Sequence, residues 1–140
     1  MAHGDCKAVI ETLSFLREHY RDALVVAGNV SESEATERLI CAGASCVKVG
    51  IGPSSICTTR VVTGIGRPQL EAIMRCAKVA RRHSIPICAD GGIDSTGDIV
   101  KALAAGASTV MMGSMFTGTE ECPGPVITAS GKRYKLYRGM

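Results

Sequence analysis

Hydrophobic and polar positions alternate along the chain in two regular periods. In the first stretch Val9, Leu13 and Leu16 recur at helical spacing with charged residues between them, which is typical of an amphipathic helix. Short apolar runs with few charges follow such stretches, as buried strands do. The pattern predicts helices over residues 8–20, from Ser31 or Ser33 to 42–43, over 68–82 with Pro68 as the first residue, and from Ser95 or Thr96 to 106. It predicts strands over residues 23–27, 46–49, 85–89, 108–112 and 133–137.

These elements occur as repeated strand–helix units. The run Ala-Gly-Ala-Ser-Cys-Val at 42–47 returns as Ala-Gly-Ala-Ser-Thr-Val at 105–110, and each run leads through a predicted strand to a glycine. Such repetition favours a β/α barrel over an open doubly wound sheet. No Gly-x-Gly-x-x-Gly motif follows a strand in a dinucleotide-binding register. We therefore predict an α/β fold that forms part of a (β/α)8 TIM barrel, with about four of its eight βα units.

Composition narrows the classes of function. The 140 residues carry a formal net charge of +3 and 46% of them are hydrophobic, which is typical of a folded globular chain. The charge is too small and too scattered to predict a nucleic-acid or membrane surface, and no apolar run is long enough to span a bilayer. The seven cysteines include no Cys-x-x-Cys pair, so we expect most of them to be reduced packing thiols in a cytoplasmic protein.

Glycine or a small polar residue ends each strand of the predicted sheet. These ends are Gly28-Asn29, Gly50-Ile51-Gly52, Asp90-Gly91-Gly92 and Gly113-Ser114. In a β/α barrel the ligands bind at the carboxyl ends of the strands, where glycine lets the backbone approach a phosphate closely. The last two segments could each offer backbone amides to one phosphate group. The alternative is ordinary turn chemistry, in which glycine only reverses the chain.

The segment that follows the second predicted strand is unusually long and carries a candidate nucleophile. Residues 50–68 are rich in glycine and hydroxyl side chains, and Cys57 lies among them near Arg60. A nearby cation or aligned backbone amides lower the pKa of a thiol and so make it nucleophilic. Cys57 is therefore a candidate catalytic residue, and the alternative is one more buried packing thiol.

Taken together, these motifs resemble the catalytic domain of inosine monophosphate (IMP) dehydrogenase. The resemblance covers nearly the whole chain and rests above all on Ser-Ile-Cys-Thr-Thr-Arg at 55–60, Ala-Asp-Gly-Gly-Ile at 89–93, Gly-Thr-Glu-Glu at 118–121 and Tyr-Arg-Gly-Met at 137–140. The related guanosine monophosphate (GMP) reductase shares the barrel and the cysteine loop. The last two segments are more similar to the dehydrogenase.

The resemblance implies NAD-dependent oxidation of IMP to xanthosine monophosphate (XMP) through a covalent cysteine intermediate, in guanine nucleotide biosynthesis. Cys57 would be the nucleophile, and Thr59 would lie beside the reacting carbon. Other residues would hold the phosphate (Ser55, Gly91, Gly92, Gly113, Ser114, Tyr137), the ribose (Asp90), the purine (Gly139, Met140), the nicotinamide of NAD (Asn29, Gly50) and, through backbone carbonyls, a potassium ion (Gly52, Ser54, Cys57). The resemblance also implies a homotetramer for the full-length protein.

The sequence departs from the family pattern at one position of the cysteine loop, because Ser54 stands where family members usually have glycine. The arginine–tyrosine flap that activates water in the family has no counterpart in residues 1–140. We therefore expect residues 1–140 to be a partial catalytic barrel domain, with residues 50–68 as its active-site cysteine loop and with no activity on its own. Two alternatives stay open: an NADPH-dependent GMP reductase, which would release ammonia, and a non-catalytic half-barrel.

Overall fold

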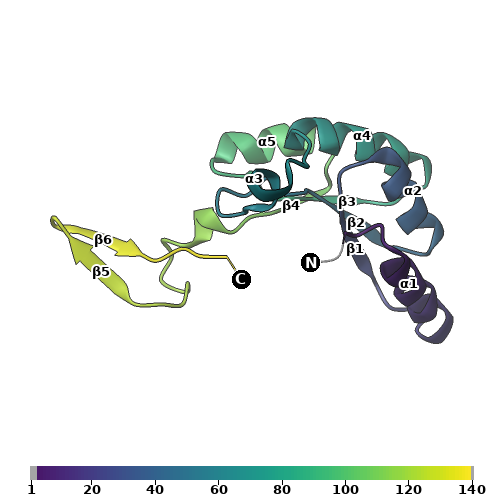
Figure 1. Ribbon diagram of the computed structural model, residues 1–140, viewed down its shortest axis with the longest axis horizontal. Coiled ribbons are helices and arrows are strands. Elements are labelled where there is room, and N and C mark those ends of the chain that lie inside the picture. The colour runs from purple at the N-terminus through teal and green to yellow at the C-terminus, as the bar shows by residue number, and fades with distance from the viewer. Residues whose placement is uncertain (1–2, 140) are drawn as a thin grey trace.

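The computed structural model describes residues 3–139 and contains two separate sheets (Figure 1). The larger sheet has four parallel strands in the order β1 (Val26–Val30), β2 (Cys46–Val49), β3 (Ile87–Asp90) and β4 (Thr109–Met111). The α-helices are α1 (Lys7–His19), α2 (Ser33–Cys41), α3 (Thr59–Thr63), α4 (Gln69–Arg82) and α5 (Thr96–Ala104), and a 3-10 turn, η1 (Ser114–Phe116), follows β4. The smaller sheet is an antiparallel hairpin of β5 (Val126–Ala129) and β6 (Lys132–Lys135).

The strand order and the placement of the helices confirm the predicted fold class. Each strand pairs in parallel with the next strand along the chain, without the reversal of order that marks a doubly wound sheet. Helices α2, α4 and α5 contact one another in chain order, and Figure 1 shows them side by side on one side of the sheet. Sequential parallel strands with their helices on a single face are the arrangement of a partial β/α barrel.

The core lies between these helices and the sheet. Val47 and Val49 of β2 are fully buried, and they pack with buried residues of α4 such as Ile73 and Cys76. The expectation that most cysteines are packing thiols is only partly right. All seven are free, Cys76 and Cys88 are buried, and the others are half-buried or exposed. Within residues 3–139 no helix is long and apolar enough to cross a membrane.

The first strand lies further along the chain than residues 23–27. Gly28 and Asn29 belong to β1, whereas the sequence predicted a turn there. The reason is tertiary, because Gly28 pairs with Lys48 of β2, and a Cβ on Gly28 would lie 2.4 Å from the Lys48 carbonyl oxygen. The register shifts between Gly28 and Val30, which leaves Asn29 at an irregularity of the strand.

Two of the predicted helix starts are wrong in detail and one is right. Neither Ser31 nor Ser33 caps α2; Glu32 takes the N-cap position without a side-chain cap, because Arg67 engages its carboxylate. Pro68 precedes α4 as its N-cap rather than serving as its first residue. Ser95 does cap α5, since its hydroxyl oxygen accepts from the backbone N–H of the third helical residue.

Sequence reasoning missed β5 and the short helix α3. It predicted one strand over 133–137 where the structure has a hairpin with β6 at Lys132–Lys135. The two residues between β5 and β6, Ser130 and Gly131, both have positive φ (50° and 72°), as a tight two-residue hairpin turn requires. The Ser-Gly pair was the available signal. Figure 1 shows this hairpin extending away from the four-stranded sheet.

Candidate functional site

The carboxyl ends of β1, β2 and β3 bring three predicted site residues into contact. The side-chain amide of Asn29 donates to the Gly50 carbonyl at 2.8 Å and to Oδ2 of Asp90 at 2.9 Å. Gly50 has a φ of +147°, and a Cβ there would lie 2.1 Å from the Asp90 carbonyl oxygen. Only glycine fits where these two strand ends approach so closely.

Two further polar residues at this edge were missed. Lys48 of β2 places its Nζ 3.0 Å from Oδ2 of Asp90. Gln69, the first residue of α4, donates from Nε2 to the carbonyls of Val49 (3.0 Å) and Asp90 (3.2 Å), while its Oε1 is buried without a hydrogen-bond partner in the described chain. A lysine inside an apolar strand and a glutamine at a helix start were the signals that could have drawn attention to them.

Cys57 lies in the loop that follows β2, outside the hydrophobic core. Its Sγ is 3.2 Å from Oγ1 of Thr59, and its backbone N–H donates to the Ser54 carbonyl at 3.0 Å. Hydrogen bonds from the side chain and backbone of Thr59 hold the pKa of the Cys57 thiol below its usual value, and the charge of Arg60 lowers the pKa further. Burial raises the pKa of the Cys76 thiol instead. The surroundings thus lower the pKa of the loop thiol and raise the pKa of the core thiol, and a lowered pKa favours the nucleophilic thiolate form.

Arg60 ties the two ends of the cysteine loop together. Its Nε donates to the Ile51 carbonyl at 2.9 Å, and its Nη2 donates to the Arg67 carbonyl at 2.5 Å. The aliphatic part of the side chain covers Gly52 and Gly66, where an added Cβ would lie 2.9 Å and 2.7 Å from Arg60 Cγ. The loop is thus closed around one guanidinium, three residues from Cys57, whose charge lowers the pKa of that thiol.

The C-terminal end of the cysteine loop is anchored to the helices that cover the sheet. Arg67 donates to both carboxylate oxygens of Glu32 at 2.8 and 2.9 Å and to Glu71 at 2.6 Å. The hydrogen bonds to Glu32 raise the pKa of Arg67 above its ordinary value. Because Glu32 precedes α2 and Glu71 is in α4, the loop end is fixed to two helices at once.

The three residues predicted to bind potassium through their carbonyls lie in one loop segment, residues 52–57. Gly52 has a φ of +66°, and the Ser54 carbonyl already accepts from the N–H of Cys57, which leaves its second lone pair for a cation. Ser54 is not among the residues with positive φ, so the serine that replaces the usual family glycine is conformationally unstrained. Neutral carbonyl oxygens are the ligands that potassium prefers, and the donor set is therefore suitable for that ion. No group of three or more His, Cys, Asp or Glu side chains in residues 3–139 could hold a metal.

The glycine segments predicted to hold a phosphate lie against the cysteine loop. Gly91 and Gly92 both have positive φ (85° and 70°), and Cβ atoms on them would lie 2.9 Å and 3.2 Å from the Pro53 ring. The Gly91 N–H donates to the Met111 carbonyl at 3.1 Å, which links this segment to the end of β4. The exposed Ser55 follows in the same loop.

The C-terminal segment returns to the same edge of the sheet. A Cβ on Gly113 would lie 2.7 Å from the Tyr137 hydroxyl, and a Cβ on Gly139 would lie 3.5 Å from Cδ1 of Ile56. The Ser114 hydroxyl donates to Asp94 at 3.0 Å. The structure thus brings Gly113 and Tyr137 close together. Met140 lies outside the described residues.

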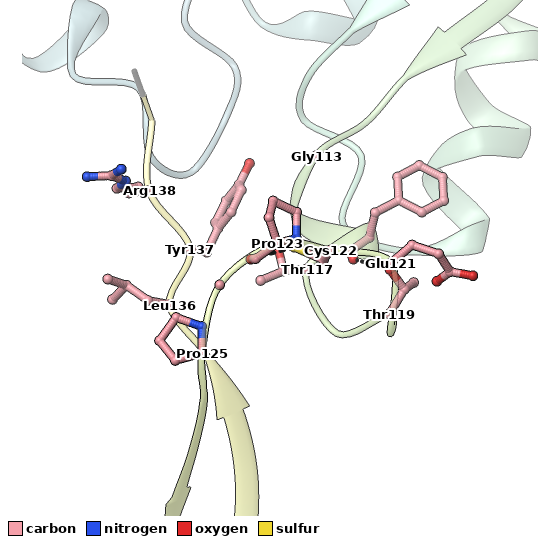
Figure 2. A pocket seen from close by; sticks show the side chains of 12 residues that line it. Gly113, Thr117, Thr119, Glu121, Cys122, Pro123, Pro125, Leu136, Tyr137 and Arg138 are labelled. Carbon is pink, nitrogen blue, oxygen red and sulfur yellow. Dashed lines mark hydrogen bonds between the residues drawn. The ribbon is translucent and has the colours of Figure 1, made fainter.

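A pocket of about 940 Å³ opens beside this segment, at the base of the β5–β6 hairpin. Figure 2 shows Tyr137 projecting toward the side of Gly113, while Arg138 points to the opposite side. Gly113, Tyr137 and Arg138 line the pocket, but Cys57 and Asp90 do not. The candidate site is therefore the open edge formed by the strand ends and the cysteine loop, and the pocket borders it at Gly113 and Tyr137.

Comparisons of the sequence with known proteins give a match to one family model and to several named relatives. The sequence model of the IMP dehydrogenase / GMP reductase domain matches residues 1–140. The chain is 59% identical to an inosine-5'-monophosphate dehydrogenase of Chlorobaculum parvum and 58% identical to one of Aquifex aeolicus, each over 99% of this chain. It is 52% identical to one of Nitrosopumilus maritimus over its whole length. The chain spans only 28–29% of the length of these relatives.

Proposed function

The chain belongs to the IMP dehydrogenase / GMP reductase family, and we propose that it forms part of the catalytic β/α barrel of an enzyme that oxidises IMP to XMP with NAD. One observation carries the proposal. Cys57, whose thiol pKa is lowered by Thr59 and Arg60, stands in a loop that packs against Gly91 and Gly92 at the end of β3. A thiol of lowered pKa, in a loop that packs against the glycine backbone following a carboxylate, suits a purine ribonucleotide.

Cys57 supplies the covalent step. Its thiolate adds to C2 of the hypoxanthine ring, and a C–S bond forms. The hydrogen on C2 then leaves as a hydride, so the purine is oxidised by two electrons and remains attached to sulfur as a thioimidate. Water adds to the same carbon, the C–S bond breaks, and XMP leaves with the oxygen of water at C2 while the thiol recovers a proton. Thr59, whose hydrogen bonds lower the pKa of the Cys57 thiol and so favour the thiolate, lies beside the reacting carbon.

The strand ends hold the substrate. The Asp90 carboxylate accepts hydrogen bonds from the ribose hydroxyls, since a carboxylate is an acceptor that can take both. The purine contacts are assigned to Gly139 and to Met140, which is outside the described residues. The phosphate is bound by backbone amides and side-chain hydroxyls of Ser55, Gly91, Gly92, Gly113, Ser114 and Tyr137. The contacts of Gly91 with Pro53 and of Gly113 with Tyr137 support this grouping.

Two bound groups complete the proposed site. NAD, when bound, accepts the hydride, and the assigned contacts are Asn29 and the backbone of Gly50. Because Nδ2 of Asn29 is committed to Gly50 and Asp90, its carbonyl oxygen is the atom that can face the nicotinamide. A potassium ion on the carbonyls of Gly52, Ser54 and Cys57 would bridge this segment of the cysteine loop. We extend the proposal to a cytoplasmic homotetramer of the full-length protein.

The test uses the full-length protein that contains these residues. It is assayed for NAD reduction with IMP, and separately for NADPH oxidation and ammonia release with GMP. We expect turnover only in the first assay, loss of turnover in Cys57→Ser, and retention of it in the control Cys41→Ser, since Cys41 is exposed on α2. Mass spectrometry of a quenched reaction should find the purine nucleotide on the peptide that carries Cys57. Turnover of GMP without turnover of IMP would assign the chain to the reductase branch and refute the proposal.

A further inference from the structure

Lys48 occupies a position where a lysine needs an explanation. It lies in β2 between Val47 and Val49, which are both fully buried against the helices. Because strand residues alternate between faces, Lys48 points to the opposite face of the sheet, the interior side of a β/α barrel. Its side chain is only 29% exposed. A cation held there is costly unless a partner compensates it.

That partner is the carboxylate of Asp90. Lys48 Nζ lies 3.0 Å from Oδ2 of Asp90, whose own side chain is 23% exposed, and 3.8 Å from Sδ of Met111 on β4. Asn29 donates to the same Oδ2 at 2.9 Å. Both donors thus converge on one carboxylate oxygen from the two preceding strands. Within residues 3–139, Oδ1 receives no hydrogen bond, and it is the oxygen left for an incoming ligand.

We propose that Lys48 is a positioning residue that fixes Asp90 with Oδ1 turned toward the ribose, and that it thereby sets a preference for ribonucleotides over 2′-deoxyribonucleotides. This inference rests on the proposed function, in which Asp90 binds the ribose hydroxyls. With Lys48 in place, two donors hold the carboxylate before the substrate arrives. Binding of the ribose hydroxyls then costs less side-chain entropy of Asp90. Without Lys48, Asn29 is the one remaining donor to the Asp90 carboxylate within residues 3–139.

The experiment compares steady-state kinetics of the full-length protein with IMP and with 2′-deoxy-IMP at saturating NAD, and it measures KM for NAD separately at saturating IMP. The variants are Lys48→Met, Lys48→Arg, Asp90→Asn and the double variant that combines Lys48→Met with Asp90→Asn. For Lys48→Met we expect KM for IMP to rise about tenfold, as for loss of one hydrogen bond to a charged group, with kcat changed much less and KM for 2′-deoxy-IMP nearly unchanged. Lys48→Arg should restore most of the preference, and the double variant should match Asp90→Asn alone.

A matched control separates this effect from general destabilisation. Lys101 forms an ion pair with Asp98 at 3.1 Å on α5, away from the strand ends, so Lys101→Met should leave both KM values unchanged. If Lys48→Met does not fold, Lys48→Gln takes its place with the same expected direction, because an uncharged donor holds a carboxylate more weakly.

The outcomes are distinguishable. Equal increases in KM for both nucleotides would make Lys48 a structural residue, and an increase confined to KM for NAD would make it a cofactor contact; either result overturns the inference alone. If Asp90→Asn keeps the ribose preference, the assignment of Asp90 fails and the inference fails with it. If the enzyme does not turn over IMP, the proposed function itself is wrong.

Discussion

Arg60 offers the sharpest test of how the cysteine loop is held. Arg60→Met removes two hydrogen bonds from a guanidinium to the carbonyls of Ile51 and Arg67, at 2.9 and 2.5 Å. Hydrogen bonds from charged donors contribute roughly 1.5–3 kcal/mol each, and the lower value applies to this half-buried side chain. The closed loop should therefore lose about 3 kcal/mol relative to its open states, which corresponds to about a hundredfold at 1.4 kcal/mol per factor of ten.

Amide hydrogen exchange measures this equilibrium directly in the full-length protein. The backbone N–H groups of Cys57, Val62 and Gly64 make hydrogen bonds within the loop, so their exchange reports how often the loop opens. In Arg60→Met, peptides covering residues 50–68 should exchange up to about a hundredfold faster, while peptides of buried α4 serve as an internal reference. Arg60→Lys keeps the charge but cannot reach both carbonyls as a planar group, so we expect an intermediate rate.

The control is Arg21→Met, since Arg21 is exposed and lies outside the loop. It should leave the exchange of residues 50–68 unchanged. Unaltered exchange of these residues in Arg60→Met would show that the two hydrogen bonds do not hold the loop, and the reasoning above would be refuted.

Three further predictions follow from local contacts. Thr59→Val removes the hydrogen bond that most lowers the Cys57 pKa, so the pH profile of alkylation at Cys57 should move to higher pH; an unmoved profile would exclude that cause. Gly91→Ala places a Cβ 2.9 Å from the cysteine loop at a φ of +85° and should destabilise the fold by roughly 1–3 kcal/mol in urea unfolding, whereas Gly118→Ala, which has open space, should not. Ser95→Ala removes the α5 cap and should cost about 1 kcal/mol in the same assay, and an unchanged midpoint would contradict the cap.

Local signals predicted those parts of the fold that depend on neighbouring residues. Helical spacing located α1 and α4 to within a residue or two, and the apolar run at Cys46–Val49 matched β2 at both ends. Where a long-range partner decides the local structure, the prediction was wrong. Gly28 was expected in a turn, but pairing with β2 draws it into β1. Glu32, whose carboxylate binds the distant Arg67, takes the N-cap position of α2 in place of Ser31 or Ser33.

The candidate site divides in the same way. Residue types and their order along the chain identified Cys57, Asp90 and the glycine segments, because a nucleophile and close backbone approach each need particular residues. The positions of Lys48 in an apolar strand and of Gln69 at a helix start were visible locally, but their partners were not, since each acts on a carbonyl or carboxylate more than 20 positions away in the chain. Spacing alone does not say which residues of two strands lie opposite each other.

The sequence by itself therefore determined the alternation of strands and helices, the family and the identity of the candidate nucleophile. Tertiary structure decided which groups meet at the carboxyl edge of the sheet. The register of β1, β2 and β3 brings Asn29 and Lys48 to one carboxylate oxygen of Asp90. The folded cysteine loop lets Arg60 donate hydrogen bonds to carbonyls at both ends of that loop. The physical reason is that strand register and loop closure are fixed by packing and hydrogen bonds between distant segments, and these contacts exist only once the chain has folded.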